Sequence, residues 1–479
     1  MSVDATIVGS GPNGLAAALI LARAGLSVRV LEQADAIGGG LRSAELTLPG
    51  FVHDVGSAVH PMAFASPFFR GWEAERRIPF VIPEASFGHP FVGQQASIGW
   101  RDLDRTAAEL GRDGDAYRRL LRPLVERIDG VADFTLHHLL RIPRDPIAAV
   151  AFGLRVLEQG TIDWNTRFHG RRAPAMLTGV AAHANADLPS LAASAVGLAL
   201  VANAHARGWP LPIGGSQAIA DAMAADIRAH GGEIETGVMV DGPADVGNSG
   251  AVVLDTSVRT LARFGRDTLP EGYLRALTRF PTGRGVAKVD FALDGPVPWS
   301  DPRLQAAPTV HVGGTRAQIA AAERTVAAGR VPDRPYVLVV QPTVADPTRA
   351  PAGGHVLWTY IHVPTGMDFD ATELITTELE RFAPGFRDRI LGSAAMTATD
   401  IERHDPNNIG GDILGGAVTV DRLLRRPVLA RLPWRTPQPG LFLASASTPP
   451  GPGVHGMGGW LAAREVLRDA GLAMPDLSS

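Results

Sequence analysis

The segment DATIVGSGPNGLAAALILARAGLSVRVLE, residues 4–32, constrains the fold more than any other part of this 479-residue chain. Its apolar run ATIV suits a buried parallel strand, and Gly9, Gly11 and Gly14 follow at once in the spacing GxGxxG. An alanine- and leucine-rich stretch then predicts a helix, and VRVLE supplies a second strand. This order of parts predicts an α/β fold with a Rossmann-like dinucleotide-binding unit.

Each residue of the glycine-rich turn has a separate role in such a unit. The first glycine permits a tight turn, the second lets the backbone approach a pyrophosphate, and the third packs helix against strand. Pro12 and Asn13 open the helix, whose free N–H groups and dipole favour phosphate. Glu32, 18 residues after Gly14 and followed by Gln33, stands where a carboxylate accepts the ribose hydroxyls and argues against a 2′-phosphate. An unliganded glycine-rich turn is the alternative, and the fingerprint does not distinguish FAD from NAD.

A second glycine cluster follows the second strand. Gly39 and Gly40, with Arg42 two residues on, offer further backbone N–H groups and a guanidinium to a diphosphate. The alternative is a flexible surface loop.

These motifs, followed by GFVHDVGSAVHP, resemble the FAD-dependent phytoene desaturase and flavin amine oxidase superfamily. The resemblance is strongest to phytoene-dehydrogenase-like proteins of the pyridine nucleotide-disulphide oxidoreductase domain-containing protein 2 type, and it spans essentially the whole chain. It implies FAD as the cofactor.

Two later segments take part in this resemblance. In the family, a turn, helix and strand corresponding to residues 208–241 bring a valine backbone to the adenine, which implies Val240 here. Read from the residues, Ser216 is a plausible N-cap of that helix. The family's usual hairpin after this strand is replaced by the short DGPADVGNS. Near the C-terminus, the resemblance places a loop and helix start against the flavin; its residues are Gly453, Val454, His455, Gly456 and Met457.

Three distant cofactor segments predict a discontinuous domain. We expect residues 1–75, 208–275 and 436–479 to form the FAD-binding domain. Residues 76–207 and 276–435 would then form a mixed α+β substrate-binding domain, helical over 100–207 and sheet-forming over 276–400.

The chain's single lysine, Lys288, lies in the apolar strand-like segment GVAKVDFAL. This segment resembles the flavin amine oxidase strand whose lysine holds a water near flavin N5, and a desolvated lysine can accept a proton. The alternative is an ordinary surface lysine on an edge strand. Tyr360 and His362, on one face of a later strand, and His455 are weaker catalytic candidates, because a lone histidine is more often structural.

Composition narrows the range of partners and compartments. A formal charge of −4 without a basic block argues against nucleic acid, and the absence of cysteine fits a cytoplasmic protein. The apolar run 191–206 is too short for a membrane span, and neither it nor the N-terminus predicts a transmembrane segment, although a peripheral membrane contact stays open. No spacing of histidines and carboxylates predicts a metal site. The oligomeric state is not determined.

The function that follows is an FAD-dependent oxidoreductase. The resemblance implies desaturation or isomerisation of an apolar, polyene or carotenoid-like substrate, with hydride transfer to flavin N5. One alternative is oxidation of a C–N bond with O2, as in amine oxidases. A second is an FAD-binding scaffold or partner protein that turns nothing over.

Overall fold

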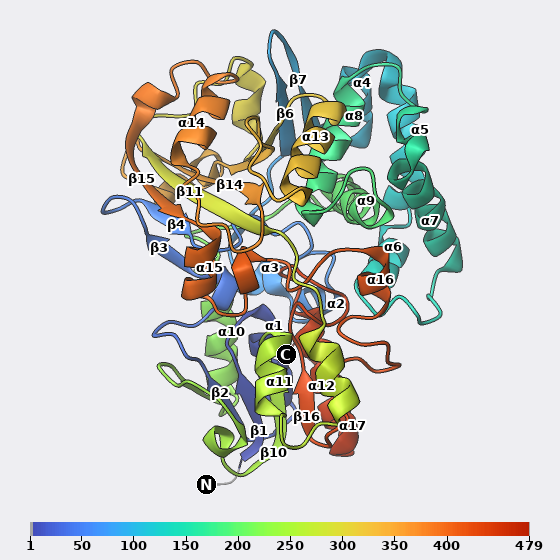
Figure 1. Ribbon diagram of the computed structural model, residues 1–479, viewed down its shortest axis with the longest axis vertical. Coiled ribbons are helices and arrows are strands. Elements are labelled where there is room, and N and C mark those ends of the chain that lie inside the picture. The colour runs from blue at the N-terminus through green and yellow to red at the C-terminus, as the bar shows by residue number, and fades with distance from the viewer. Residues whose placement is uncertain (1–2, 479) are drawn as a thin grey trace.

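The computed structural model describes residues 3–478 and has two halves, which lie one above the other in Figure 1. The lower half contains a five-stranded parallel sheet with the order β16–β10–β1–β2–β9. The strands are β1 (Val3–Val8), β2 (Val28–Leu31), β9 (Glu233–Glu235), β10 (Ser249–Leu254) and β16 (Leu441–Leu443). The expected α/β fold with a Rossmann-like core is confirmed, and all five strands come from the three predicted cofactor segments.

Helices cover both faces of this parallel sheet, as buried parallel strands require. One face packs against α1 (Pro12–Arg23), α10 (Gln217–Ala229) and α17 (Met457–Asp469), whose apolar side chains share one core with the strands. The other face packs against α11 (Val258–Phe264) and α12 (Glu271–Thr278). The two layers hold the carboxyl ends of β1, β2 and β10 facing the upper half.

The upper half contains a seven-stranded mixed sheet with the order β15–β11–β14–β13–β12–β6–β7. Only the contact between β12 and β6 is parallel among the described strand pairs of this sheet. The strands are β6 (Ala85–Phe91), β7 (Gln94–Trp100), β11 (Gly285–Leu293), β12 (Thr309–Val312), β13 (Val337–Val340), β14 (His355–Val363) and β15 (Ile390–Met396).

Helices also lie on both faces of the mixed sheet. One face and α14 (Thr372–Glu380) share an apolar core. The other face packs against a helical layer that forms the right-hand side of Figure 1. That layer consists of α4 (Leu103–Glu109), α5 (Gly114–Val125), α6 (Ile128–Thr135), α7 (Pro146–Gly160), α8 (Arg172–Ala181), α9 (Leu191–Ala206) and α13 (Arg316–Ala327).

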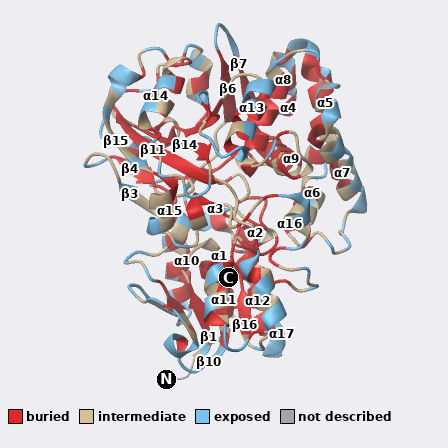
Figure 2. Ribbon diagram, viewed as in Figure 1, coloured by how far each residue is buried: buried red, intermediate tan, exposed pale blue. Residues whose placement is uncertain are grey.

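Shorter elements connect the two halves. They include the hairpin of β3 (Ser43–Glu45) and β4 (Val52–Asp54), the pair β5 (Phe80–Val81) and β8 (Leu211–Pro212), and the helices α2 (Pro67–Gly71), α3 (Ala74–Arg77), α15 (Ala398–His404) and α16 (Val420–Leu424). Figure 2 shows the buried residues concentrated in the two sheets and in the helix faces against them.

Three local expectations have clear outcomes. The strand of Lys288 is β11, which lies between β14 and β15 and is buried at all nine positions, so the edge-strand alternative is wrong. Ser216 is the N-cap residue of α10, as expected, but its hydroxyl donates to the carbonyl of Ser57 (2.6 Å) and accepts no helix N–H. The run 191–206 is helix α9, and no helix within residues 3–478 is both long and apolar enough to cross a bilayer.

Candidate cofactor and substrate site

A large cavity lies between the parallel sheet, the mixed sheet and the helical layer. Its volume is about 1160 Å³, and its lining residues come from almost the full length of the chain. This exceeds the roughly 300–1,000 Å³ of pockets for drug-sized ligands. The cavity therefore has room for more than one small molecule, such as a cofactor and a substrate.

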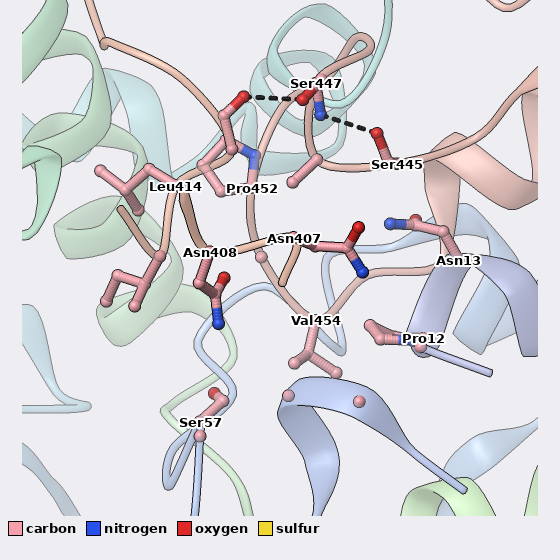
Figure 3. A pocket seen from close by; sticks show the side chains of 18 of the residues that line it. Pro12, Asn13, Ser57, Asn407, Asn408, Leu414, Ser445, Ser447, Pro452 and Val454 are labelled. Carbon is pink, nitrogen blue, oxygen red and sulfur yellow. Dashed lines mark hydrogen bonds between the residues drawn. The ribbon is translucent and has the colours of Figure 1, made fainter. Parts of the chain in front are cut away.

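The three glycines of the glycine-rich turn occupy positions where a side chain would be strained or would clash. Gly9 has a φ of +94°, and a Cβ on Gly14 would lie 2.1 Å from the carbonyl oxygen of Gly9. A Cβ on Gly11 would lie 2.6 Å from a carboxylate oxygen of Asp255. Helix α1 begins directly after this turn at Pro12, and Pro12 and Asn13 line the cavity (Figure 3). The N-terminus of α1 therefore faces a space where an anion is favoured.

Glu32 follows the last residue of β2 and is held by the same turn. One carboxylate oxygen accepts hydrogen bonds from the backbone N–H (2.9 Å) and the hydroxyl (2.6 Å) of Ser10. The other accepts from the N–H of Ala34 (2.9 Å). These contacts fix the carboxylate at the cavity wall and leave it lone pairs for further hydroxyl donors.

Asp255, at the end of β10, is a site residue that sequence reasoning missed. Its carboxylate accepts the N–H of Gly14 (2.7 Å) and lies against the cavity. Burial raises its pKa to about 7, and the negative charges of Asp405 and Glu32 act in the same direction. A signal was present in the sequence, because Asp255 directly follows the apolar strand segment GAVVL, but no motif marks that position.

Four cavity-lining residues have a buried polar atom without a hydrogen-bond partner among the described residues: Arg42, His137, Thr256 and Trp358. Two of these atoms lie in the predicted cofactor segments. They are Nε of Arg42 and the hydroxyl of Thr256. A terminal nitrogen of Arg42 lies 2.6 Å from Nε2 of His404, which also lines the cavity. A buried polar atom without a hydrogen-bond partner destabilises the fold, so such atoms usually meet a ligand or water. A guanidinium N–H and a hydroxyl at this wall suit a ligand that carries phosphate and sugar groups.

We call the end of the cavity formed by the glycine-rich turn, Glu32 and Arg42 the cradle. The C-terminal segment forms a further wall of it. Ser445 to Ser447 and Pro452 to His455 line the cavity beside Asn13 (Figure 3). The side chain of Asn13 accepts the N–H of Gly458 (3.1 Å), and a Cβ on Gly459 would lie 1.9 Å from the carbonyl oxygen of Asn13. This close packing sets the starts of α1 and α17 next to each other, so two helix N-termini converge on one space.

Lys288 lies on the cavity wall in the upper half. Its side chain is 4% exposed, and its ammonium is paired with the carboxylate of Asp290, two residues along the same strand face. Burial lowers the pKa of Lys288, and the charges of Asp290 and Asp54 oppose that shift. The nitrogen is also 5.8 Å from the ring centre of Trp358.

The weaker catalytic candidates divide into two groups. Tyr360 lines the cavity next to Lys288, in edge-to-face contact with Trp358 (5.2 Å between ring centres). His455 also lines the cavity, but its Nδ1 accepts the N–H of Met457 (3.1 Å), and burial lowers its pKa to about 4. His362 is not among the cavity-lining residues, because its Nδ1 is bound to Glu323 (2.7 Å) on α13.

The end of the cavity beyond Lys288 is apolar. Among the described lining residues, those from α6, α7, α9 and the mixed sheet include no carboxylate. The five lining carboxylates, Glu32, Asp241, Asp255, Glu402 and Asp405, lie outside these elements. The apolar lining consists of side chains from α6, α7, α9, the mixed sheet and the segment before α16, among them Phe152, Val156, Val196, Leu338 and Leu414.

The cradle agrees with a comparison to known protein families. Residues 7–70 match the family model of an NAD(P)-binding Rossmann-like domain. This Rossmann-like domain supplies β1, α1, β2 and the second glycine cluster. Within residues 3–478, no group of histidines and carboxylates is arranged to hold a metal ion.

Comparisons over the whole chain extend this result. The chain is 26% identical to the rat (Rattus norvegicus) pyridine nucleotide-disulfide oxidoreductase domain-containing protein 2, over 97% of this chain and 93% of the relative. The mouse (Mus musculus) protein of the same name is 24% identical over the same shares. The expected likeness to this type of protein is confirmed, and the likeness to phytoene desaturases stays a prediction.

Solved structures share the fold over the full length. An oxidoreductase from Methanosarcina mazei has a TM-score of 0.61 and 16% identity, covering 97% of this chain and 100% of that one. A triple mutant of putrescine oxidase has a TM-score of 0.63 and 17% identity, covering 98% and 99%. Cyclohexylamine oxidase from Brevibacterium oxydans has a TM-score of 0.58 and 16% identity, covering 98% and 100%.

Most residues predicted around the Rossmann-like domain line one cavity. These are Gly9, Gly11, Pro12, Asn13, Glu32, Gln33, Gly39, Gly40, Arg42, Val240, Gly453, Val454 and His455. Gly14, Gly456 and Met457 do not line it; they shape the helix starts behind it. Residues 405–408 and 445–447, which lie in irregular loops, also line the cavity.

Proposed function

We propose that this protein is an FAD-dependent oxidoreductase that dehydrogenates or isomerises an apolar substrate of the polyene type. One observation carries the proposal: a single cavity runs from a dinucleotide cradle to an apolar chamber, with Lys288 on its wall. The whole-chain likeness to an oxidoreductase domain-containing protein and to amine oxidases supports the same chemistry.

The cradle residues fit FAD. The N–H groups of the glycine-rich turn, the start of α1 and Arg42 would bind the diphosphate, and Glu32 would accept ribose hydroxyls. When bound, FAD supplies the acceptor of a hydride equivalent. The neutral His455 and the helix starts would leave the isoalloxazine end without a competing side-chain charge.

The chain's own residues then have three tasks. The apolar wall binds and orients the substrate and excludes water. Lys288, whose pKa is lowered by burial, holds or accepts a proton at Nζ. Asp290 keeps that nitrogen directed along the strand face.

Oxidation of a C–N bond is the second candidate. The observation in its favour is the contact between Trp358 and Tyr360 beside Lys288, because two aromatic rings can bind an alkylammonium group. The lack of a carboxylate among the described residues of the apolar chamber favours the uncharged substrate. An FAD-binding scaffold without turnover is the third reading.

Anaerobic reduction of the FAD-loaded protein separates these functions. We expect bleaching of the flavin absorbance by a polyene or another long apolar substrate, and none by primary amines. Bleaching by amines alone, with peroxide formed on admission of O2, would instead establish the amine oxidase. Protein that binds FAD but is reduced by no member of either panel would identify the scaffold.

We also propose that the substrate arrives from a lipid surface. Helix α7 contributes Phe152 and Val156 to the cavity and exposes Ile147, Val150 and Leu154 by 60 to 63%. Leu157 belongs to both surfaces, since it lines the cavity and is 53% exposed. An exposed apolar stripe that meets the cavity in this way fits a peripheral membrane contact.

A further inference from the structure

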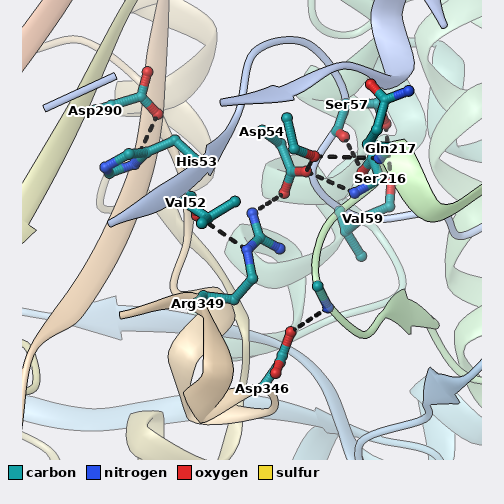
Figure 4. Close-up of polar contacts among 12 residues, drawn as sticks. Val52, His53, Asp54, Ser57, Val59, Ser216, Gln217, Asp290, Asp346 and Arg349 are labelled. Atoms are coloured by element: carbon teal, nitrogen blue, oxygen red, sulfur yellow. Dashed lines mark hydrogen bonds and ion pairs between the residues drawn. The ribbon is translucent and has the colours of Figure 1, made fainter. Parts of the chain in front are cut away.

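The buried contact between Lys288 and Asp290 continues away from the cavity. Asp290 is 1% exposed and is not a lining residue, so it lies behind the lysine. One of its carboxylate oxygens holds the ammonium of Lys288, and the other points to His53 on β4, as Figure 4 shows. The lysine therefore has a polar neighbour on the side opposite to the cavity.

The facing atoms of Asp290 and His53 are otherwise unsatisfied. Oδ1 of Asp290 and Nδ1 of His53 are both buried, neither has a hydrogen-bond partner among the described residues, and they are 3.6 Å apart. That separation is only about 0.4 Å beyond the ordinary N–H···O range, and it leaves no room for an intervening water. A small rotation of the imidazole would close it.

His53 reaches the protein surface through its other nitrogen. Nε2 lies 2.8 Å from the hydroxyl of Thr47, which is half-buried in the turn between β3 and β4. The four groups therefore form a series from the cavity wall to the edge of the β3–β4 hairpin, with one gap of 3.6 Å between Asp290 and His53. Each step joins a proton donor to an acceptor.

We infer that Asp290, His53 and Thr47 are positioning residues that carry a proton between Lys288 and solvent, an inference that rests on the proposed function of Lys288. The ammonium gives one proton to Oδ2 of Asp290, and a half-turn of the carboxyl group presents that O–H to Nδ1 of His53. His53 releases its Nε2 proton to Thr47, whose hydroxyl passes its own hydrogen to water. One proton leaves Nζ and one enters the solvent, and each group returns to its starting charge.

This path solves a problem that the proposed reaction creates. Substrate and cofactor would fill the cavity and exclude water, so a proton collected at Nζ would have no exit on that side. The other charged and titratable groups near the pair do not offer one. Asp54 is held by Arg349 (2.9 Å), His404 by Arg42 (2.6 Å), and burial raises the pKa of Tyr360.

The single lysine makes a direct test practical. Protein labelled with ¹⁵N-lysine gives one Nζ signal, and its proton exchange with water can be measured without turnover in the FAD-loaded protein with a non-reacting apolar ligand in the cavity. In His53→Gln and in Thr47→Val we expect exchange slowed by roughly tenfold or more, the lower scale of a lost proton-transfer group. Thr47→Ser should restore the rate, because it restores only the hydroxyl.

Control variants distinguish a proton path through His53 and Thr47 from a structural role of these residues. His89→Gln removes another fully buried histidine, on β6, and should leave the exchange of Nζ unchanged. Unchanged exchange in both His53→Gln and Thr47→Val would overturn the inference, because the protons would then leave through the cavity. If His53→Gln does not fold, the pair Thr47→Val and Thr47→Ser, at the surface, decides alone. Failure of the FAD-reduction experiment would leave this result unaffected, so the two proposals fail separately.

Discussion

The carboxylate of Asp255 accepts the backbone N–H of Gly14 at 2.7 Å, which joins the first turn of α1 to the end of β10 across 241 positions of the chain. The contact ties the glycine-rich turn to the third strand of the cradle. It also buries a carboxyl group whose pKa is raised to about 7.

Asp255 predicts a pH-dependent stability. A carboxyl group whose folded pKa lies above its unfolded value stabilises the fold at low pH, and this stability falls as the pH rises from about 4 to about 7. The shift corresponds to at most about 4 kcal/mol. We expect Asp255→Asn to gain stability relative to the parent over this range, measured as the difference in free energy of unfolding in urea. A difference that does not change with pH would contradict the prediction.

The buried histidines predict the opposite trend below pH 6.5. Burial lowers the pKa of His60, His89, His205 and His455 to about 4 and that of His183 to about 3. The unfolded chain therefore binds protons first, and stability is lost as the pH falls from about 6.5 towards 4, by up to about 3 kcal/mol for each group. For the five groups together this is up to about 15 kcal/mol, the upper end of the usual 5–15 kcal/mol of a folded domain. We expect cooperative unfolding in circular dichroism above pH 4, and a protein still folded at pH 4 would disprove this.

A side chain at position 14 should disrupt the cofactor cradle. A methyl group on Gly14 would meet the carbonyl oxygen of Gly9 at 2.1 Å, a backbone atom that cannot move without opening the turn. We expect Gly14→Ala to bind no FAD, measured by the visible absorbance after reconstitution. Gly242→Ala is the matched control, because a Cβ there meets no atom within 4 Å. FAD retained by Gly14→Ala at the parent's affinity would contradict the proposed cradle.

Lys288 predicts a kinetic defect. Lys288→Met removes the only ammonium on the cavity wall and should slow reduction of the bound flavin by more than about tenfold in stopped-flow measurements. It also leaves the Asp290 carboxylate buried without a counter-ion, which should cost roughly 3–5 kcal/mol of stability. Lys288→Met/Asp290→Asn removes both charges and separates the two effects. An unchanged rate in the single variant would end the catalytic assignment.

Helix α7 predicts binding to lipid. In the variant Ile147→Asp/Leu154→Asp we expect at least about tenfold weaker co-sedimentation with phosphatidylcholine vesicles, since each buried aliphatic side chain contributes about 1.5–3 kcal/mol. Leu391→Asp is the control, because Leu391 is 52% exposed but lies on β15, on the side of the molecule away from α7 in Figure 1. Equal binding by all three proteins, or no binding by the parent, would exclude this surface as the route of substrate entry.

Several elements could be predicted closely because their signals are local. The strand β11 begins and ends at the residues of the expected segment GVAKVDFAL, and α17 starts at Met457, within the expected loop and helix start. Gly9, Gly11 and Glu32 could be assigned to a nucleotide site from spacing alone, because a tight turn and a helix start are properties of adjacent residues. The single lysine could also be recognised as a candidate site residue from the apolar segment around it, without knowledge of the fold.

Other parts of the site depend on contacts between distant segments. The sequence by itself determined a Rossmann-like unit, its glycine-rich turn and a lysine in an apolar strand. Only the tertiary structure decided that Asp255 holds Gly14, that His362 faces Glu323 instead of the cavity, and that His53 lies behind Lys288 and Asp290. The physical reason is that a side chain's partner and burial are set by which strands and helices pack together, and a residue's neighbours in the chain do not contain that information.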